Sequence, residues 1–242
     1  EKQALELAAE HKRADVLSRF IQDASHEFRT PLAIIQTGAY LLSRTDDADV
    51  KRRKADQIED QVTRITQLVT MLTAQSALDS DVPMENVPIS INELIQYCIG
   101  RMEALITRRE IQLELELDPE LPRIRGDGDR LGDAFSQLLD NALRFTLAGG
   151  RVIVTTRQTE FWVVTEFRDT GIGIAPEELP HIFERFYRSD EAHTTAGLGL
   201  GLSIANKIIE RHNGKIDVES TAGIGSVFRV LLPFASHADR ET

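Results

Sequence analysis

The sequence predicts two domains of different fold class: an all-α helical hairpin over residues 1–80 and an α+β two-layer sandwich over residues 81–242. Up to residue 80, apolar residues recur alternately every three and four positions, and Pro31 and Gly38 are the sole helix breakers. A segment with two prolines follows at 81–92. Beyond it, short alternating runs typical of strands are separated by helical stretches, which indicates an α+β fold.

Two apolar seams and the turn between them indicate the hairpin. The first seam is Leu17, Ile21, Ala24, Phe28, Pro31, Ile35, Gly38 and Leu42, and the second is Ile58, Val62, Ile65, Val69 and Leu72. The Asp-rich segment 43–50 suits a turn and a helix start. Because two helices bury little apolar surface, we expect a second copy to complete a four-helix bundle, which makes the protein a homodimer.

The second domain shows strand and helix patterns in alternation. Strands are expected at 111–117, 152–156, 162–167, 215–219 and 226–232, and helices at about 92–107, 128–145 and 198–212. This order predicts a mixed sheet with the helices on one face.

Composition excludes several classes of protein. The 242 residues carry a net charge of -11, which argues against nucleic-acid binding through a broad basic surface. Cys98 is the single cysteine, so neither a disulfide framework nor a cysteine-based zinc finger is possible. No apolar run reaches the roughly 18 residues of a membrane span, so we expect no membrane contact within this fragment. Because the chain starts at Glu1, we expect a soluble piece of a longer protein, whose missing N-terminal part could hold a membrane anchor.

The run HEFRTPL at 26–32 is the first candidate site. His26 falls farthest from the seam and should point to solvent, with Thr30 one turn on and on the same face. The carboxylate of Glu27 can keep one ring nitrogen protonated and leave the other free to act as a nucleophile. A zinc site of the H-E-x-x-H type is not supported, because Thr30 stands where the second histidine belongs. The alternative is an ordinary solvated helix face.

Asn141, in the run DNALRF at 140–145, is the second candidate. An asparagine inside a helix needs partners for its amide, and its oxygen is a suitable ligand for a Mg²⁺ ion that keeps several waters. The alternative is an asparagine satisfied within the core or at a cap.

Two glycine-rich runs follow. DTGIGI at 169–174 comes directly after a strand, where glycines permit close approach to a ligand or merely a tight turn. GLGLGLS at 197–203 leads into a helix, whose first N–H groups can bind a phosphate. It follows a polar loop and not a strand, which counts against a Rossmann site, and no P-loop motif occurs.

In this order on one chain, these motifs closely resemble the catalytic core of bacterial sensor histidine kinases. HEFRTPL resembles the phospho-acceptor box, DNALRF the N box, DTGIGI and GLGLGL the two glycine boxes, FERFYR at 183–188 the phenylalanine box, and 223–226 the late glycine motif. The resemblance implies the ATP-binding fold shared with DNA gyrase, mismatch-repair ATPases and heat-shock chaperones. Two positions depart from the family pattern: Gln137, where an asparagine is usual, and Leu198, where a small hydroxyl residue is frequent.

The resemblance also implies roles. His26 attacks the γ-phosphate of ATP, Glu27 receives its proton, and Asn141 binds Mg²⁺ that bridges the phosphates. Asp169 accepts a hydrogen bond from the adenine amino group, and a lid over 183–201 closes on the nucleotide. The remaining residues expected at the nucleotide are Arg144, Phe145, Gly171, Gly173, Arg185, Arg188, Gly197, Gly199 and Gly201.

The resemblance further implies that the phosphoryl group passes to an aspartate in the receiver domain of a response regulator. Thr30 is expected to hold water for the reverse activity, dephosphorylation of the regulator. Two alternatives stay open: an ATPase or chaperone of the same fold, which would lack the HEFRTPL hairpin, and a catalytically weak ATP-binding dimer that acts as a regulator-binding or phosphatase module.

Overall fold

The computed structural model describes residues 25, 28–78, 84–185, 187 and 199–234. The chain divides into two compact units, one that contains the residues up to Ala74 and one that contains Gln75–Tyr187 and the chain from Gly201 onward. The first contains the predicted helical hairpin, and the second contains the predicted sheet with its three helices. The predicted fold class, a helical region followed by an α+β sandwich, is confirmed.

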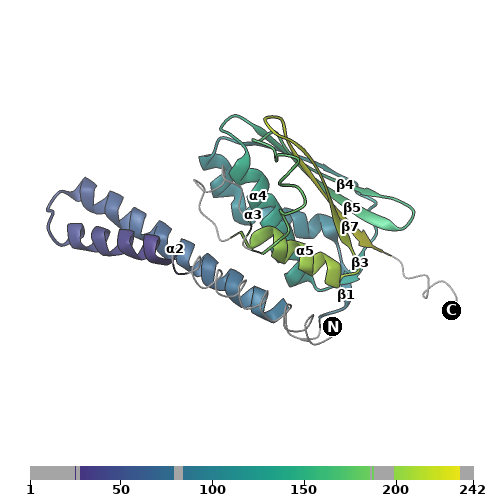
Figure 1. Ribbon diagram of the computed structural model, residues 1–242, viewed down its shortest axis with the longest axis horizontal. Helices are drawn as coiled ribbons and strands as arrows, with labels where there is room; N and C mark the ends of the chain where they lie inside the picture. The colour runs from purple at the N-terminus through teal and green to yellow at the C-terminus, as the bar shows by residue number, and fades with distance from the viewer. Residues whose placement is uncertain (1–24, 26–27, 79–83, 186, 188–198, 235–242) are drawn as a thin grey trace, which may run out of the picture. The chain divides into compact units, whose positions relative to one another are not determined.

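The first unit is the predicted antiparallel helical hairpin, seen in Figure 1. Residues 28–42 are helical and continue through Pro31, and helix α2 spans Ala48–Leu78. Between them, Asp47 Oδ1 accepts the backbone N–H groups of Asp49 and Val50 at 2.9 and 3.1 Å, which caps the start of α2. The Asp-rich turn was therefore read correctly from the sequence.

The predicted seam residues of α2 have different environments within one chain. Ile58 contacts Gly38 closely, because a Cβ on Gly38 would lie 3.0 Å from Ile58 Cγ1, and Leu68 is 4% exposed. The predicted seam residues Val62 and Val69 are 50% and 46% exposed. The prediction places these residues between two copies of the hairpin, so their exposure in one chain does not contradict it, and their burial by a second copy stays a prediction.

The second unit is built on a five-stranded mixed sheet of order β2-β4-β5-β7-β6. β2 (Gln112–Leu117) is parallel to β4 (Arg151–Gln158), and the other pairs are antiparallel: β4 with β5 (Trp162–Asp169), β5 with β7 (Gly225–Pro233) and β7 with β6 (Lys215–Thr221). A second, two-stranded sheet pairs β1 (Val87–Ile89) with β3 (Ile124–Gly126) and was not predicted, because three residues are too few to show alternation.

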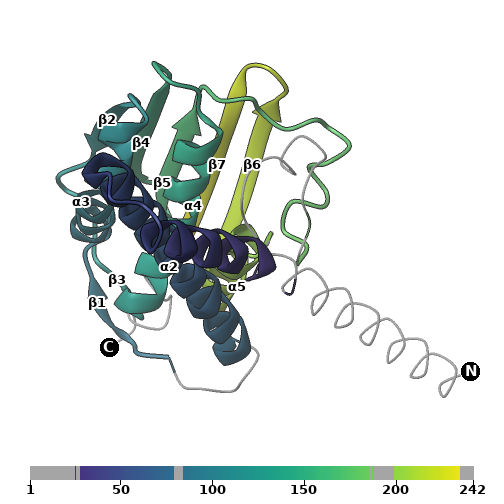
Figure 2. The same ribbon diagram turned by 90° about the vertical axis from the view of Figure 1, so that its left-hand side faces the viewer.

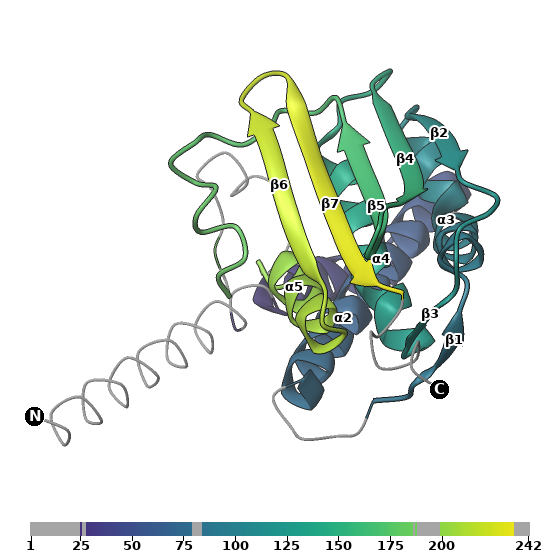
Figure 3. The same cartoon turned by 90° about the vertical axis from the view of Figure 1, so that its right-hand side faces the viewer.

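Three helices cover one face of the large sheet: α3 (Ile91–Arg108), α4 (Gly128–Phe145) and α5 (Gly201–Arg211). Figure 2 shows this covered face, and Figure 3 shows the open face of the sheet. The apolar stripe of α4 contributes Phe135, Leu138 and Leu139 to the core, and Phe135 contacts Phe167 of β5 with ring centroids 5.8 Å apart. This packing fixes α4 against the strand that ends at the first glycine run.

Candidate nucleotide and phospho-acceptor sites

Asp169 ends strand β5 and is buried, with 5% of its surface exposed. Its Oδ1 accepts the backbone N–H groups of Gly171 at 2.8 Å and Ser226 at 3.3 Å, whereas Oδ2 receives no hydrogen bond from any described residue. Burial raises the pKa of Asp169, and these two N–H groups oppose the rise without cancelling it. A buried carboxylate with one oxygen available is suited to accept a hydrogen bond from a ligand.

The loop after Asp169 depends on its glycines because protein backbone lies directly against them. A Cβ on Gly171 would overlap the carbonyl of Phe145, and a Cβ on Gly173, whose φ is 68°, would overlap that of Thr221. Ile172 donates its N–H to the carbonyl of Phe145 at 3.2 Å. The loop is therefore held between the end of α4 and the β6–β7 hairpin.

Two serines of that hairpin support the loop, and the sequence interpretation gave them no role. Ser220 Oγ accepts the N–H of Ile174 at 2.8 Å and lies 2.9 Å from Ser226 Oγ. Ser226 is the residue that donates its N–H to Asp169. The sequence marks the glycine motif at 223–226, but only the pairing of β5 with β7 shows that this motif contacts Asp169.

The last turns of α4 contain the predicted magnesium ligand. The side chain of Asn141 is half-buried and forms no hydrogen bond with a described residue. The alternative interpretation, an asparagine whose amide is satisfied by such a residue, is therefore not supported. Arg144 Nη2 pairs with Asp140 Oδ2 at 2.7 Å. Phe145 is the final residue of α4 and contacts the glycine loop through its carbonyl. Asn141, Phe145 and the Asp169 loop are thus brought together at one end of α4.

Helix α5 begins at Gly201, as the second glycine run predicted. Gly199 has a φ of 66°, which a glycine adopts without strain. A Cβ on Gly201 would lie 2.5 Å from Gln137 Oε1, so this glycine permits Gln137 to lie against the start of α5. Gly197 and Arg188 lie outside the described residues, and Arg185 is exposed.

In the helical unit, His26 and Glu27 also lie outside the described residues. Thr30 is exposed and helical, while Pro31 beside it is buried. The solvent-facing position predicted for Thr30 is therefore confirmed.

The residues present fit a magnesium ion of the kind that keeps most of its waters. Asn141 offers an oxygen without a described partner, and the described residues contain no cluster of three or more His, Cys, Asp or Glu that could cage an ion. A Mg²⁺ ion bound here would have nucleotide phosphates and water as its other ligands.

The second unit is thus a mixed sheet covered on one face by three helices, with a glycine loop held against the end of its central helix α4. Residues 126–236 match the family described as histidine kinase-, DNA gyrase B- and HSP90-like ATPase, and residues 16–81 match the His Kinase A phospho-acceptor domain. The chain belongs to the sensor histidine kinases and contains the two domains of their catalytic core.

Relatives support this assignment. The chain is 35% identical over 90% of its length to sensor histidine kinase RppB of Synechocystis sp., and 31% identical over 96% of its length to the phosphate regulon sensor protein PhoR of Pseudomonas aeruginosa. It spans about half of these relatives, 49% and 53% of their lengths.

Two solved structures show the same architecture. Histidine kinase ThkA in complex with response regulator protein TrrA superposes with a TM-score of 0.72 at 26% identity, over 93% of this chain and 64% of that one. A mycobacterial sensor histidine kinase, MprB, superposes with a TM-score of 0.54 at 31% identity, over 61% of this chain and 97% of that one. Among the helices that the structure describes, none combines the length and the apolar run that a bilayer-spanning segment requires.

Proposed function

We propose that this chain is the core of an ATP-dependent histidine kinase that autophosphorylates His26 and passes the phosphoryl group to an aspartate in the receiver domain of a response regulator. The observation that carries the proposal is the available Oδ2 of buried Asp169, beside the α4 end that bears Asn141. An adenine amino group matches this acceptor, and a Mg²⁺ ion bound by the Asn141 oxygen would hold the triphosphate at this end of α4.

The transfer balances as an in-line displacement. A ring nitrogen of His26 forms a bond to the γ-phosphorus as the bond from that phosphorus to the β–γ bridging oxygen breaks, and ADP leaves. The proton released by the attacking imidazole passes to Glu27. Asn141 would hold a Mg²⁺ ion, which would supply neutralising charge to the phosphates of a nucleotide bound to a chain of net charge -11. Arg144, Arg185 and Arg188 are further candidates for phosphate contact.

A homodimer is part of the proposal. Leu32, Tyr40, Val62 and Val69 are exposed apolar residues of the hairpin, and a second hairpin packed against them would remove them from water. The exposed hydroxyl of Thr30, one helical turn after His26, supports a second activity, dephosphorylation of the regulator. Both activities use partners found in the cytoplasm, where we place the fragment.

Incubation with γ-labelled ATP tests the kinase. The chain should acquire acid-labile label, and His26→Gln should abolish it while nucleotide affinity stays unchanged. His181→Gln removes an exposed histidine outside the hairpin and should label like the wild type. Persistent labelling of the His26→Gln protein would remove His26 from the mechanism. An unlabelled wild type that still accelerates regulator dephosphorylation would favour the phosphatase module.

A further inference from the structure

The four carbonyls at the end of α4 have no partner within the helix, and each is bonded from outside it. The carbonyl of Ala142 accepts the N–H of Thr146 at 3.2 Å and its hydroxyl at 2.7 Å. The carbonyl of Phe145 accepts the N–H of Ile172. The two carbonyls between them, those of Leu143 and Arg144, are bonded by one side chain from another helix.

That side chain is Arg109, the C-cap residue of α3. Its Nη1 donates to the carbonyl of Leu143 at 3.2 Å and to that of Arg144 at 2.9 Å. Hydrogen bonds from a guanidinium to helix C-terminal carbonyls are charge-assisted, and the positive charge also suits the negative end of the helix dipole. Arg109 is half-buried and comes from 34 positions earlier in the chain than Leu143.

These bonds hold the turn that carries the phosphate end of the candidate site. Asn141 precedes the two bonded carbonyls by two and three residues, and Phe145 contacts the glycine loop directly after them. Besides the bond from Ile172 to the Phe145 carbonyl, the loop has anchors on the β6–β7 hairpin, because Asp169 is bonded to Ser226 and Ile174 to Ser220. Without Arg109, the last turn of α4 would lose two hydrogen bonds from outside the helix. The adenine end of the site would keep its bonds to Ser226 and Ser220.

We propose that Arg109 is a positioning residue for the magnesium–phosphate half of the nucleotide site, acting through the end of α4 on Asn141. The inference rests on the proposed function. It predicts that Arg109 controls how strongly Mg²⁺ improves binding of a phosphorylated nucleotide, and that it leaves adenosine binding unaffected.

The test compares Arg109→Met, Arg109→Lys and the control Arg108→Met in the full chain. Arg108 is the exposed neighbour of Arg109 and has no described hydrogen-bond or ion-pair partner. Calorimetry, carried out well below the melting temperature of each variant, measures two quantities. These are the affinity for adenosine and the affinity for ADP at increasing concentrations of Mg²⁺. In Arg109→Met, the Mg²⁺ concentration that produces half of the increase in ADP affinity should be roughly tenfold higher than in the wild type. The affinity for adenosine should change by less than about twofold. Arg109→Lys should recover part of the loss, because an ammonium can bond a carbonyl without the fork geometry.

Each other outcome is decisive. Equal losses of adenosine and Mg·ADP affinity in Arg109→Met would indicate a general structural role and overturn the inference. If Arg109→Met and Arg108→Met have the same affinities for adenosine and Mg·ADP, the inference is also overturned, while the proposed function stands. A wild type that binds neither adenosine nor Mg·ADP would defeat the proposed function, and this inference with it. If Arg109→Met fails to melt cooperatively, Arg109→Lys decides, and an unchanged Mg²⁺ requirement there counts against positioning.

Discussion

Asp169 Oδ1 accepts the backbone N–H of Ser226, 57 residues further along the chain, at the point where β5 ends beside the start of the antiparallel strand β7. Gly225, directly before Ser226, lies so close to Asp169 that a Cβ there would overlap the Asp169 carbonyl. The position of the carboxylate is therefore set jointly by its own strand and by a strand formed much later in the chain.

Replacement of Asp169 should weaken ATP binding. Asp169→Ala removes the acceptor for the adenine amino group in a buried site, which should cost about 1–3 kcal/mol of binding free energy. Discrimination against GTP should decrease as well, since guanine presents a carbonyl at that edge. Calorimetry on Asp169→Ala and on Asp217→Ala, an exposed residue of β6, makes the comparison. Equal affinities in the two variants would remove Asp169 from the site.

Two glycine substitutions should have opposite effects on stability. Gly225→Ala forces a Cβ against the Asp169 carbonyl at a φ of 139°, so both the melting temperature and ATP affinity should fall. Gly100→Ala places a methyl group in open space within α3 and should stabilise the protein by about 0.5–1 kcal/mol. Thermal unfolding of both variants tests this, and a neutral Gly225→Ala would contradict the close approach.

His212 should make stability decrease as the pH falls below its unfolded-state pKa. It is buried, its Nδ1 donates to the Ile208 carbonyl at 2.8 Å, and its Nε2 accepts the N–H of Asp127 at 3.0 Å, so the neutral ring is the bonded form. Burial lowers the pKa of His212 from 6.5; Asp127 opposes this, and the positive charges of Arg130 and Arg211 add to it.

Because this pKa is lower in the folded state, the unfolded chain binds more protons below about pH 6.5, and the free energy of unfolding falls there. Denaturant unfolding between about pH 8 and 5.5 should show this slope. In His212→Gln the slope should shrink, whatever the variant's stability at pH 8. An unchanged slope would assign the effect to other groups.

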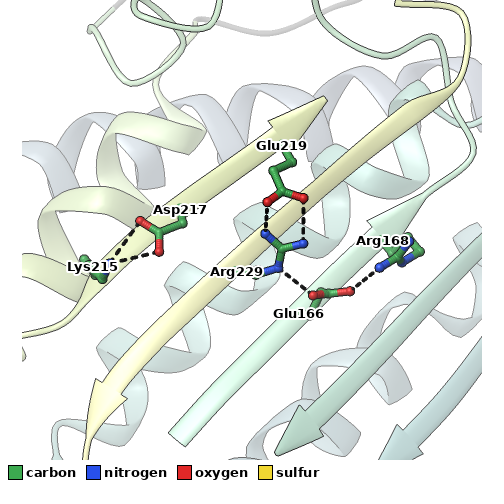
Figure 4. A network of polar contacts seen from close by, with 6 residues as sticks. All are labelled: Glu166, Arg168, Lys215, Asp217, Glu219 and Arg229. Atoms are coloured by element: carbon green, nitrogen blue, oxygen red, sulfur yellow. Dashed lines mark hydrogen bonds and ion pairs between the residues drawn. The ribbon is translucent and has the colours of Figure 1, made fainter. Parts of the chain in front are cut away.

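Glu166 should add a second loss of stability at lower pH. Figure 4 shows its carboxylate between Arg168 and Arg229, each at 2.7 Å, with Arg229 also paired to Glu219. Burial alone would raise the pKa of Glu166, but hydrogen bonds from the two arginines outweigh it and lower the pKa from 4.5. The stabilisation is therefore complete above 4.5 and is lost as pH falls through the folded-state pKa.

Glu166→Gln tests this network, with the exposed Lys215–Asp217 pair of the same face as control. At neutral pH, Glu166→Gln should lower the free energy of unfolding by about 1–3 kcal/mol, since it leaves a half-buried arginine with one carboxylate fewer. Asp217→Asn should change it by less than about 1 kcal/mol. Chemical denaturation gives both values, and equal effects would show that the network contributes no more than a surface pair.

Thr30→Ala should separate two activities of the helical unit. Autophosphorylation needs the imidazole, Glu27 and Mg·ATP, so it should stay within about twofold, whereas regulator dephosphorylation should slow at least roughly tenfold because it needs an oriented water. Thr37 is also exposed and lies two turns further along the same helix, so Thr37→Ala is the matched control. Equal losses of both activities would mean that Thr30 acts through the local backbone before Pro31.

Local patterns in the sequence were sufficient for most elements. Periodicity predicted the hairpin, its turn, the three helices of the second unit and its five longer strands, and the motifs marked Asn141 and Asp169. These features depend on residues a few positions apart, where helix and strand geometry dictate which side chains share a face.

Other features were decided by tertiary structure. Val62 and Val69 fit the helical periodicity as well as Ile58 does, yet within one chain Ile58 packs against Gly38 and the two valines are exposed. Ser226 reaches Asp169 through the pairing of β5 with β7, and Arg109 reaches the end of α4 across the α3–α4 contact. Side-chain periodicity carries no information on which distant segments pair, because that choice depends on the burial and the hydrogen bonds gained when the whole chain closes on itself.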